Sequence, residues 1–577
     1  MDVELIIFYK KEKARVFSEI ERLRIDQNRR LCYGDIIHAA PRPRNVTALS
    51  RTHPLFNHMN RGFFMLARSF SFGLNGLDAY PITIEVDVGK GLPALTIVGL
   101  PDSAIRESKE RVRAAIKNSH YTFPSARITI NLAPADTPKE GPCFDLPIAL
   151  GLLAATEQLP DAALARFTSL GELSLTGDIK AVSGCLPASI ASTSEREDKI
   201  DGLIVPLANA QEAALAENAR IFPFRKLADV VQFLHSPENM PPFKRTEEPV
   251  SLNEIPTGLN FADVKGQSVA KRGLEIASAG GHNVLMIGPP GSGKTMLARR
   301  FPSILPPMTR AEALEITKIH SITGYARTDR SLIVQRPFRT PHHSASTVAL
   351  VGGGSDPKPG EVTLAHNGVL FLDELPEFGR CALEALRQPL EDRCVTIARA
   401  SKTLRFPSKF TLLAAMNPCP CGHLGDRKKA CRCSGAQIQR YQTKVSGPLL
   451  DRIDIHLEVP ALKTEDLLNA PAGESSETIR ARVLAARQRQ LERFTGEDVY
   501  ANAQMSHRHI KESCGLDKPG QKLLKEAVES LGISARAHDK ILRLARTIAD
   551  LDGHETVDAA HLAEAIGYRT LDRSMTA

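Results

Sequence analysis

The alternation of hydrophobic and polar positions predicts a mixed α/β domain over residues 65–235. Three short stretches alternate as half-buried strands do: Ile82–Val88, Ala94–Val98 and Ala126–Leu132. Asp102–Asn118 has the charged, amphipathic pattern of a surface helix. Asp145–Thr156 is strongly apolar after a KEGP turn, so we expect a buried helix there.

The pattern changes twice after this domain. Residues 236–258 are rich in proline and charge and poor in large apolar residues, which indicates a linker. Over residues 259–460, short apolar strands alternate with helices, the pattern of a parallel sheet with covering helices. Residues 461–577 form a C-terminal helical domain in which the strand signals vanish and four helices are predicted, over Glu477–Gln490, Gly520–Leu531, Ala535–Leu551 and Val557–Thr570.

Residues 1–64 differ from the rest of the chain. They combine a short basic amphipathic stretch with a PRPR segment and turn residues, and no period is sustained. Met65 then opens a segment with clear strand-like alternation. We expect the functional protein to begin at Met65, with residues 1–64 an extension, disordered or a misassigned start; a genuine flexible arm is the alternative.

Composition narrows the class of protein. Hydrophobic residues make up 42% and charged residues 24% of the 577 residues, which excludes collagen, a coiled-coil rod and wholesale disorder. No apolar run approaches the length of a membrane helix, and the first residues lack a secretory signal, so a soluble, cytoplasmic protein is predicted. The net charge is +8, but residues 1–64 hold 12 Lys and Arg against 7 Asp and Glu, which leaves only +3 for the rest. Bulk charge therefore does not argue for nucleic-acid binding.

The strongest chemical signal is a phosphate-binding loop. The eight residues Gly288, Pro289, Pro290, Gly291, Ser292, Gly293, Lys294 and Thr295 fit the pattern GxxxxGK[ST]. A buried apolar strand over 283–287 precedes them, and a helix over 295–301 is predicted to follow. In this setting backbone N–H groups surround the phosphates of ATP, Lys294 reaches the β- and γ-phosphates, and Thr295 ligates Mg²⁺.

Two further strand ends are expected beside this loop. The apolar run Val369–Leu372 ends in Asp373 and Glu374, the Walker B pattern. Asp373 is predicted to hold Mg²⁺ through water, and Glu374 to orient and deprotonate the attacking water. A third strand over 410–416 ends at Asn417, which we expect to lie between the other two strand ends and to contact the γ-phosphate or the lytic water.

On these motifs the chain resembles the AAA+ ATPases, and within them the helix-2-insert group of magnesium chelatase subunits and MCM helicases. The segment SGPLLDRID at 446–454 is similar to the segment that presents the arginine finger in that group. The resemblance implies that Arg452 reaches the γ-phosphate of a neighbouring subunit. It also implies that Arg536, in the segment SAR, is the sensor 2 arginine, acting on the nucleotide of its own or a neighbouring subunit. The alternative for each is a surface or salt-bridging arginine; for Arg452 the partner would be Asp451 or Asp454.

Four cysteines are crowded into fifteen residues, in the order CxC, nine residues, CxC. Four thiolates on two short turns can close a tetrahedron around Zn²⁺, so Cys419, Cys421, Cys431 and Cys433 are the predicted ligands. His423 is a possible substitute for one thiolate. Because Arg427, Lys428, Lys429 and Arg432 lie within the cluster, contact with a DNA backbone is a second possibility; a purely structural role or free thiols are the alternatives.

The turn NLAPADTPKEGPCFD at 131–145 resembles the active-site turn of the Lon protease domain, and GELSLTGDIKAVSG at 171–184 resembles that domain's second signature. Cys143 stands at the position of the nucleophilic serine, and Leu186 at that of the catalytic lysine. Leucine cannot take a proton, so a Lon-like fold without protease activity is predicted. A cysteine nucleophile with another base, such as Lys139, stays open.

This order of parts, together with the segment RPFRTPHHSAS at 336–346, is similar to the magnesium-chelatase-like ComM/YifB family from Met65 to about residue 573. The resemblance implies a hexameric DNA motor that promotes branch migration during integration of transforming DNA. Two alternatives stay open: an ATPase subunit for metal insertion into a tetrapyrrole, and an ATP-gated scaffold without translocation. His342 and His343 lack an evident third ligand, so no role is assigned to them.

Overall fold

The computed structural model describes residues 65–193, 200–245, 258–323, 332–354, 357–399, 402–426, 429–461, 473–531 and 534–569. Residues 1–64, and 246–257 of the predicted linker, lie outside this range. The described residues all belong to one compact unit. None of their helices is both long and apolar enough to cross a lipid bilayer.

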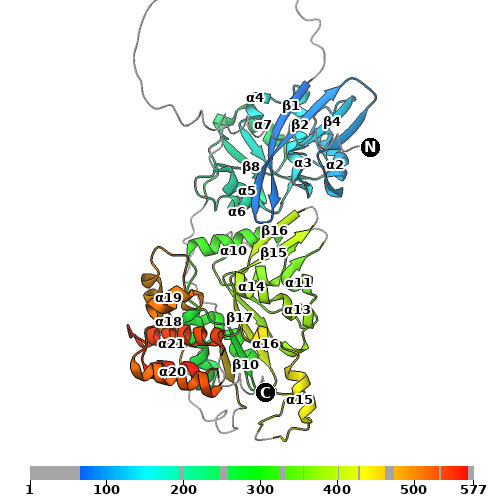
Figure 1. Ribbon diagram of the computed structural model, residues 1–577. Helices are drawn as coiled ribbons and strands as arrows, with labels where there is room; N and C mark the ends of the chain where they lie inside the picture. Colours follow the sequence, from blue (N-terminus) through cyan, green and yellow to red (C-terminus); the bar gives the residue numbers. More distant parts are fainter. Residues whose placement is uncertain are drawn as a thin grey trace, which may run out of the picture. The chain divides into compact units, whose positions relative to one another are not determined.

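The first domain is built on a seven-stranded mixed sheet in the order β3-β4-β2-β1-β5-β8-β9 (Figure 1). Its strands are β1 (Met65–Asn75), β2 (Asp78–Gly89), β3 (Ala94–Val98), β4 (Arg127–Ala133), β5 (Phe167–Ser169), β8 (Gly202–Pro206) and β9 (Ile221–Phe224). The hairpin β6 (Glu172–Leu173) and β7 (Ile179–Lys180) lies apart from this sheet. The helices are α2 (Ser103–Asn118), α3 (Asp145–Ala155), α4 (Asp161–Leu164), α5 (Cys185–Ser192), α6 (Ala210–Ala213) and α7 (Leu227–His235).

Buried and partly exposed side chains alternate along β2, and the buried ones belong to the hydrophobic core of the first domain. Ile82, Ile84 and Val86 are buried, whereas the residues between them are partly exposed. Their side chains pack in one cluster with those of α3, every residue of which is buried. Helix α2 in turn contacts α3 with its buried face. A helix enclosed on all sides is apolar all round, which is why α3 shows no amphipathic period.

The second domain contains a five-stranded parallel sheet in the order β11-β14-β17-β10-β18. Its strands are β10 (Val284–Ile287), β11 (Phe338–Arg339), β14 (Val369–Leu372), β17 (Thr411–Met416) and β18 (Ile455–Glu458). Two hairpins stand apart from it, β12 (Gly352–Gly353) with β13 (Lys358–Pro359), and β15 (Cys394–Arg399) with β16 (Lys402–Pro407). The helices are α8 (Ser268–Gly280), α9 (Lys294–Arg300), α10 (Arg310–Thr323), α11 (Thr347–Val351), α12 (Glu361–Leu364), α13 (Arg380–Ala385), α14 (Arg387–Asp392), α15 (Gly435–Gln442) and α16 (Gly447–Leu450).

Both faces of this sheet are buried, in two separate clusters. Val284 and Met286 of β10 join one cluster, which also contains residues of α8 and α9. Leu285, between them, joins the other cluster with residues of α13 and β16. Because successive side chains point to opposite faces, a strand covered on both sides is apolar along its whole length. This explains the continuous apolar runs in the sequence.

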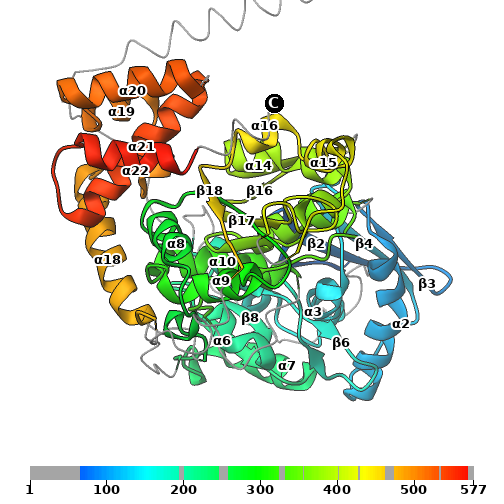
Figure 2. The ribbon, with the colours of Figure 1, turned by 90° about the horizontal axis from the view of Figure 1, so that it is seen from below.

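The C-terminal helices are α18 (Ser476–Arg493), α19 (His507–Ser513), α20 (Lys518–Leu531), α21 (Ala535–Asp552) and α22 (Ala559–Gly567). They gather together, and α18 and α21 contact α8 (Figure 2). The predicted helices are confirmed to within a few residues. Helix α19 was not predicted because seven residues carry too little periodicity. Helix α22 begins later than expected because Asp558 caps it, while Val557 forms a β-bridge with Leu516.

Candidate nucleotide site and cysteine cluster

The loop over 288–295 joins β10 to α9, which is the strand–loop–helix context that its motif requires. A Cβ atom on Gly288 would lie 2.1 Å from the carbonyl oxygen of Val459, so no side chain fits there. Gly293 has a φ of 98°, in the left-handed region, and directly precedes α9. The two glycines allow the backbone to turn tightly at the end of the strand.

Lys294 points back across this loop. Its Nζ donates hydrogen bonds to the carbonyl oxygens of Gly288 and Pro289 at 2.8 and 3.0 Å, and to Oδ1 of Asn417 at 3.3 Å. Burial lowers the pKa of Lys294, while the nearby Asp373 opposes that shift. The ammonium group is thus held in the loop by weak carbonyl acceptors, which a phosphate oxygen can replace.

Thr295 and Asp373 meet beside the loop. The hydroxyl Oγ1 of Thr295 donates to Oδ2 of Asp373 at 2.7 Å, and the backbone N–H of Glu374 donates to Oδ1 of Asp373 at 2.9 Å. A hydroxyl and a carboxylate are the hard oxygen ligands that Mg²⁺ prefers. The residues predicted to hold Mg²⁺ are therefore adjacent, and their chemistry fits that ion.

Strand order brings Asn417 into the same place. Strand β17 lies between β10 and β14, with Leu413 paired to Val284 and to Phe371. In parallel strands the carboxyl ends meet at one edge of the sheet. The side chains after β10, β14 and β17 therefore converge, as the sequence predicted from the three separate motifs.

His343 is a neighbour of this site that the sequence did not reveal. Its Nδ1 lies 3.2 Å from Oε2 of Glu374, and its ring lies 4.1 Å, centroid to centroid, from that of His342. The pair of histidines was visible in the sequence, but its partner is a carboxylate some thirty residues away, just beyond the end of the next strand of the sheet. Only the pairing of β11 with β14 brings the two segments together.

Arg452 and Arg536, the two arginines predicted to contact nucleotide, do not lie beside the loop over 288–295. Arg452 follows α16, pairs with Glu391, and donates from Nη1 to the carbonyl oxygen of Pro448 at 2.8 Å. Arg536 is exposed on α21. Both line a cavity at the amino-terminal edge of the sheet, away from the loop over 288–295. The partners considered from the sequence, Asp451 and Asp454, are not the ones found.

Asp454 belongs instead to a buried network. It lies 2.9 Å from Nζ of Lys540 and 3.5 Å from Nδ1 of His282. Burial alone would raise the pKa of Asp454, but Lys540 and His282 outweigh it and hold that pKa well below its usual range. This network connects the start of β18 to α21, so it fixes the helical bundle on the sheet.

The four clustered cysteines converge. The Sγ atoms of Cys419, Cys421 and Cys431 are 3.5–3.7 Å apart, and all four sulfurs, including that of Cys433, lie within 4.8 Å of one another. Tetrahedral thiolates at a Zn–S distance of about 2.3 Å are separated by about 3.8 Å. The sulfur atoms therefore fit one Zn²⁺ ion.

His423 is directed away from the sulfurs. Its Nδ1 is 2.9 Å from Oδ2 of Asp426, which favours the four thiolates over a mixed ligand set. Backbone N–H groups of Arg432 and His423 lower the pKa of Cys421 to about 6, whereas at Cys431 and Cys433 a backbone hydrogen bond is outweighed by desolvation and the neighbouring thiols, which raise the pKa. Lys429 and Arg432 are exposed on this loop. The other two predicted cations, Arg427 and Lys428, lie outside the described residues.

This cysteine loop packs on the nucleotide site. It starts two residues after Asn417, and a Cβ atom on Gly422 would lie 2.5 Å from Cδ of Pro290. A change in the metal cluster therefore reaches both Asn417 and the loop over 288–295 through direct contact.

Comparisons with known proteins agree with this arrangement. Three family profiles match the chain: "Subunit ChlI of Mg-chelatase" over residues 84–209, "Magnesium chelatase, subunit ChlI" over 260–467, and "Magnesium chelatase, subunit ChlI C-terminal" over 473–569. The "Competence protein ComM" of Haemophilus influenzae is 45% identical over 88% of this chain and 98% of its own length. The "Uncharacterized protein YifB" of Salmonella typhimurium is 46% identical over 86% of this chain and 96% of its own length.

The chain belongs to the magnesium-chelatase-like ComM/YifB family.

Membership in the ComM/YifB family confirms the resemblance deduced from the motifs, and it implies ATPase activity with ATP and Mg²⁺. The roles of the individual residues stay predictions. A partial match to "Lon protease 2" of Bacillus subtilis, 30% identical over 26% of this chain and 28% of its own length, agrees with the Lon-like turn.

The geometry of that turn gives Cys143 little nucleophilic character. Burial, and then the charge of Asp145, raise the pKa of the Cys143 thiol to about 12. Nζ of Lys139 donates to the carbonyl oxygen of Pro134, and burial lowers its pKa. Leu186 is fully buried in an apolar cluster. Among the described residues, no side-chain base is hydrogen-bonded to Cys143; the absence of protease activity stays a prediction.

Proposed function

We propose that this ComM/YifB protein is an ATP-hydrolysing ring, a hexamer, that moves along DNA and promotes branch migration when incoming DNA recombines. One observation carries the ATPase part: at one sheet edge, Lys294 is hydrogen-bonded to Asn417 and Thr295 to Asp373. The name of the similar Haemophilus influenzae protein supports a connection with competence.

In the proposed reaction, water attacks the γ-phosphate of ATP. Glu374 orients that water and accepts its proton, and Lys294 binds the phosphate oxygens. Thr295 and Asp373 would hold Mg²⁺, which when bound neutralises charge on the phosphates. Asn417 contacts the γ-phosphate or the water from between β10 and β14. The contact of Glu374 with His343 fixes one carboxylate oxygen and leaves the other for the water.

The ring part of the proposal concerns Arg452 and Arg536. Both lie at the sheet edge opposite the P-loop, so neither can reach the nucleotide of its own chain. A head-to-tail ring places this edge against the next subunit's nucleotide site. Arg452 would then act as the finger in trans, and Arg536 as a sensor 2 arginine for the neighbour's nucleotide.

The DNA part rests on family membership and on two local features. The hairpin β12–β13 lies between α11 and α12, which supports the expected helix-2 insert. The cysteine loop displays Lys429 and Arg432, which suits contact with phosphates. The C-terminal helices would serve as the lid of the ATPase domain.

ATPase assays with no DNA, single strands, duplex and a forked junction test this function. Stimulation by branched DNA supports the motor. Hydrolysis that is indifferent to every DNA favours a chelatase-like subunit, and binding without hydrolysis favours an ATP-gated scaffold. Charge reversal at Lys429 and Arg432 should weaken DNA binding and reduce its salt dependence, whereas the same change at Lys522 and Lys525 on the exposed face of α20 should not.

A further inference from the structure

A cavity of about 650 Å³ lies at the amino-terminal edge of the five-stranded sheet. Residues that directly precede or begin four strands line it, namely Asn283, Gly368, Thr411 and Asp454. Its other wall comes from α18, α21 and the loop before α19. Asn283 is separated from Gly288 by the length of β10, roughly 17 Å in an extended strand. The nucleotide on a chain's own P-loop therefore cannot fill this cavity.

The cavity is lined by more cations than carboxylates. Arg336, Arg452 and Lys540 pair with carboxylates of the cavity. Within the described chain, no carboxylate oxygen lies within 4.0 Å of the other five cations, which are Arg393, Lys409, Arg487, Arg536 and Arg543. Among the six lining carboxylates, Asp451 has no cationic partner in the described chain, and Glu315 and Asp539 pair only with histidines, so the eight lining Lys and Arg side chains exceed the carboxylates by two. An anionic ligand would balance the excess.

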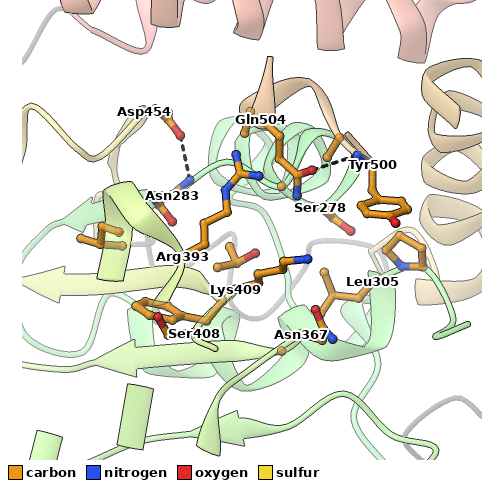
Figure 3. A pocket seen from close by; sticks show the side chains of 18 of the residues that line it. Ser278, Asn283, Leu305, Asn367, Arg393, Ser408, Lys409, Asp454, Tyr500 and Gln504 are labelled. Atoms are coloured by element: carbon orange, nitrogen blue, oxygen red, sulfur yellow. Dashed lines mark hydrogen bonds between the residues drawn. The ribbon is translucent and has the colours of Figure 1, made fainter. Parts of the chain in front are cut away.

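The Nη atoms of Arg487 are already used, because they donate to the carbonyl oxygens of Tyr500 and Ser278 at 2.8 and 3.0 Å; only its buried Nε has no acceptor among the described residues. Lys409 differs: its ammonium lies 5.9 Å from the centroid of the Tyr500 ring. Nε of Arg543 is buried and has no acceptor among the described residues. Figure 3 shows the side chains of Arg393 and Lys409 extending into the cavity.

Arg393 is held in an unfavourable state by its surroundings. It caps α14 with a φ of 55°, a conformation costly for a residue with a Cβ atom. Burial, and then the charge of Arg543, lower the pKa of its guanidinium. The charge of Asp498 opposes this shift. The two guanidinium groups repel each other, and a shared phosphate would turn that repulsion into attraction.

We propose that this cavity receives the terminal phosphates of the nucleotide bound by the neighbouring copy of the chain, and that Arg393, Lys409 and Arg543 contact them. The inference rests on the proposed ring ATPase, which supplies the neighbour. Arg452 also lines this cavity. A phosphate that binds to Arg452 would therefore lie close to the other cations as well. Arginine suits this task because its planar fork binds phosphate oxygens in pairs.

The test uses the full-length protein with Arg393→Gln and Arg543→Gln, made separately. Each should lower the rate of ATP hydrolysis about 10- to 100-fold, because a cation facing the transferring phosphate is lost. The variants Arg393→Lys and Arg543→Lys should retain part of the activity. The control Arg508→Gln, at an exposed arginine of α19 with surface partners, should hydrolyse ATP like the wild type.

Mixing two inactive variants tests whether the cavity acts on the nucleotide of the neighbouring copy. Arg393→Gln mixed with Lys294→Ala should regain activity, since some junctions contain an intact P-loop facing an intact cavity. Arg393→Gln mixed with Arg543→Gln should regain none, because both changes lie on the same side of the junction. The mixture of Arg452→Ala with Lys294→Ala is the positive control.

Three results would overturn the inference. The first is a wild-type rate in Arg393→Gln and Arg543→Gln. The second is no recovery with Lys294→Ala while the positive control recovers. The third is a loss confined to DNA-stimulated hydrolysis, which would make the cavity a DNA phosphate site. A wild type that neither assembles nor hydrolyses ATP contradicts the proposed function itself, and this inference with it.

Discussion

Nδ1 of His343 lies 3.2 Å from Oε2 of Glu374, so the expected general base is tied to the loop that follows β11. This contact holds one carboxylate oxygen and orients the other. His343→Ala should lower the maximal rate of ATP hydrolysis by about tenfold, because an untethered carboxylate spends less time aligned with the water. The apparent affinity for ATP should stay the same. His343→Gln, which retains a donor, should recover much of the rate, and a faster His343→Ala enzyme would show that the contact restrains Glu374 instead.

The substitution Glu374→Gln tests whether Glu374 is the general base of ATP hydrolysis. It keeps the size of the side chain but cannot accept the proton, so hydrolysis should fall by about 100-fold or more with ATP binding intact. Lys294→Ala should weaken ATP binding itself, since the buried ammonium group would no longer meet the phosphates. Binding of a fluorescent ATP analogue, measured beside turnover, separates the two effects. Normal hydrolysis by Glu374→Gln would show that another group is the base.

The cysteine cluster should carry about one Zn²⁺ per chain. Changing Cys419 and Cys431 together to Ser should remove the metal, which elemental analysis of reduced protein measures. Since Gly422 packs against Pro290, we also expect slower ATP hydrolysis in this variant. The double change of Cys381 and Cys394 to Ser, outside the cluster, should keep the metal. Metal-free wild-type protein would contradict the site.

The ion pair of Arg452 with Glu391 must open before Arg452 can reach another subunit. Arg452→Ala should still bind ATP and hydrolyse it poorly, and its mixture with Lys294→Ala should regain activity if the arginine acts in trans. Glu391→Gln frees the guanidinium and should raise hydrolysis in assembled protein a few-fold. A structural salt bridge predicts the opposite, namely a lower melting temperature for both variants and no recovery on mixing.

Asp145 gives the Lon-like domain a pH-dependent stability. Burial raises its pKa from 3.8 to about 6, although Arg111 opposes the shift with hydrogen bonds of 2.7 and 3.1 Å. Over this range the folded state holds a proton that the unfolded state releases. The free energy of unfolding therefore falls as the pH rises from about 4 to about 6, by up to about 3 kcal/mol. Denaturation at pH 5 and 7 should show a smaller difference for Asp145→Asn than for the wild type. Asp161→Asn, at an exposed carboxylate, is the control, and identical pH dependence in all three would refute the assignment.

Much of the nucleotide site could be predicted from the sequence, because each of its parts is local. The loop over 288–295, the strand end at Asp373 and Glu374, and the strand end at Asn417 each carry their own apolar run and turn. Parallel strands place such ends at one sheet edge whatever the details of packing. The four cysteines lie within fifteen residues, so their convergence also needed only short turns.

The remaining features were decided by tertiary structure, since their members are far apart in the chain and share no motif. His343 meets Glu374 only because β11 pairs with β14. Arg452 pairs with Glu391, which is distant in the sequence, and not with Asp451 or Asp454; Asp454 is neutralised by Lys540 of a distant helix. The cationic cavity joins strand starts to helices of the bundle, so Arg393, Lys409 and Arg543 became neighbours only when those helices packed on the sheet. Sequence periodicity specifies which face of an element is apolar; which charged groups then meet depends on how the apolar faces of distant elements are buried against each other.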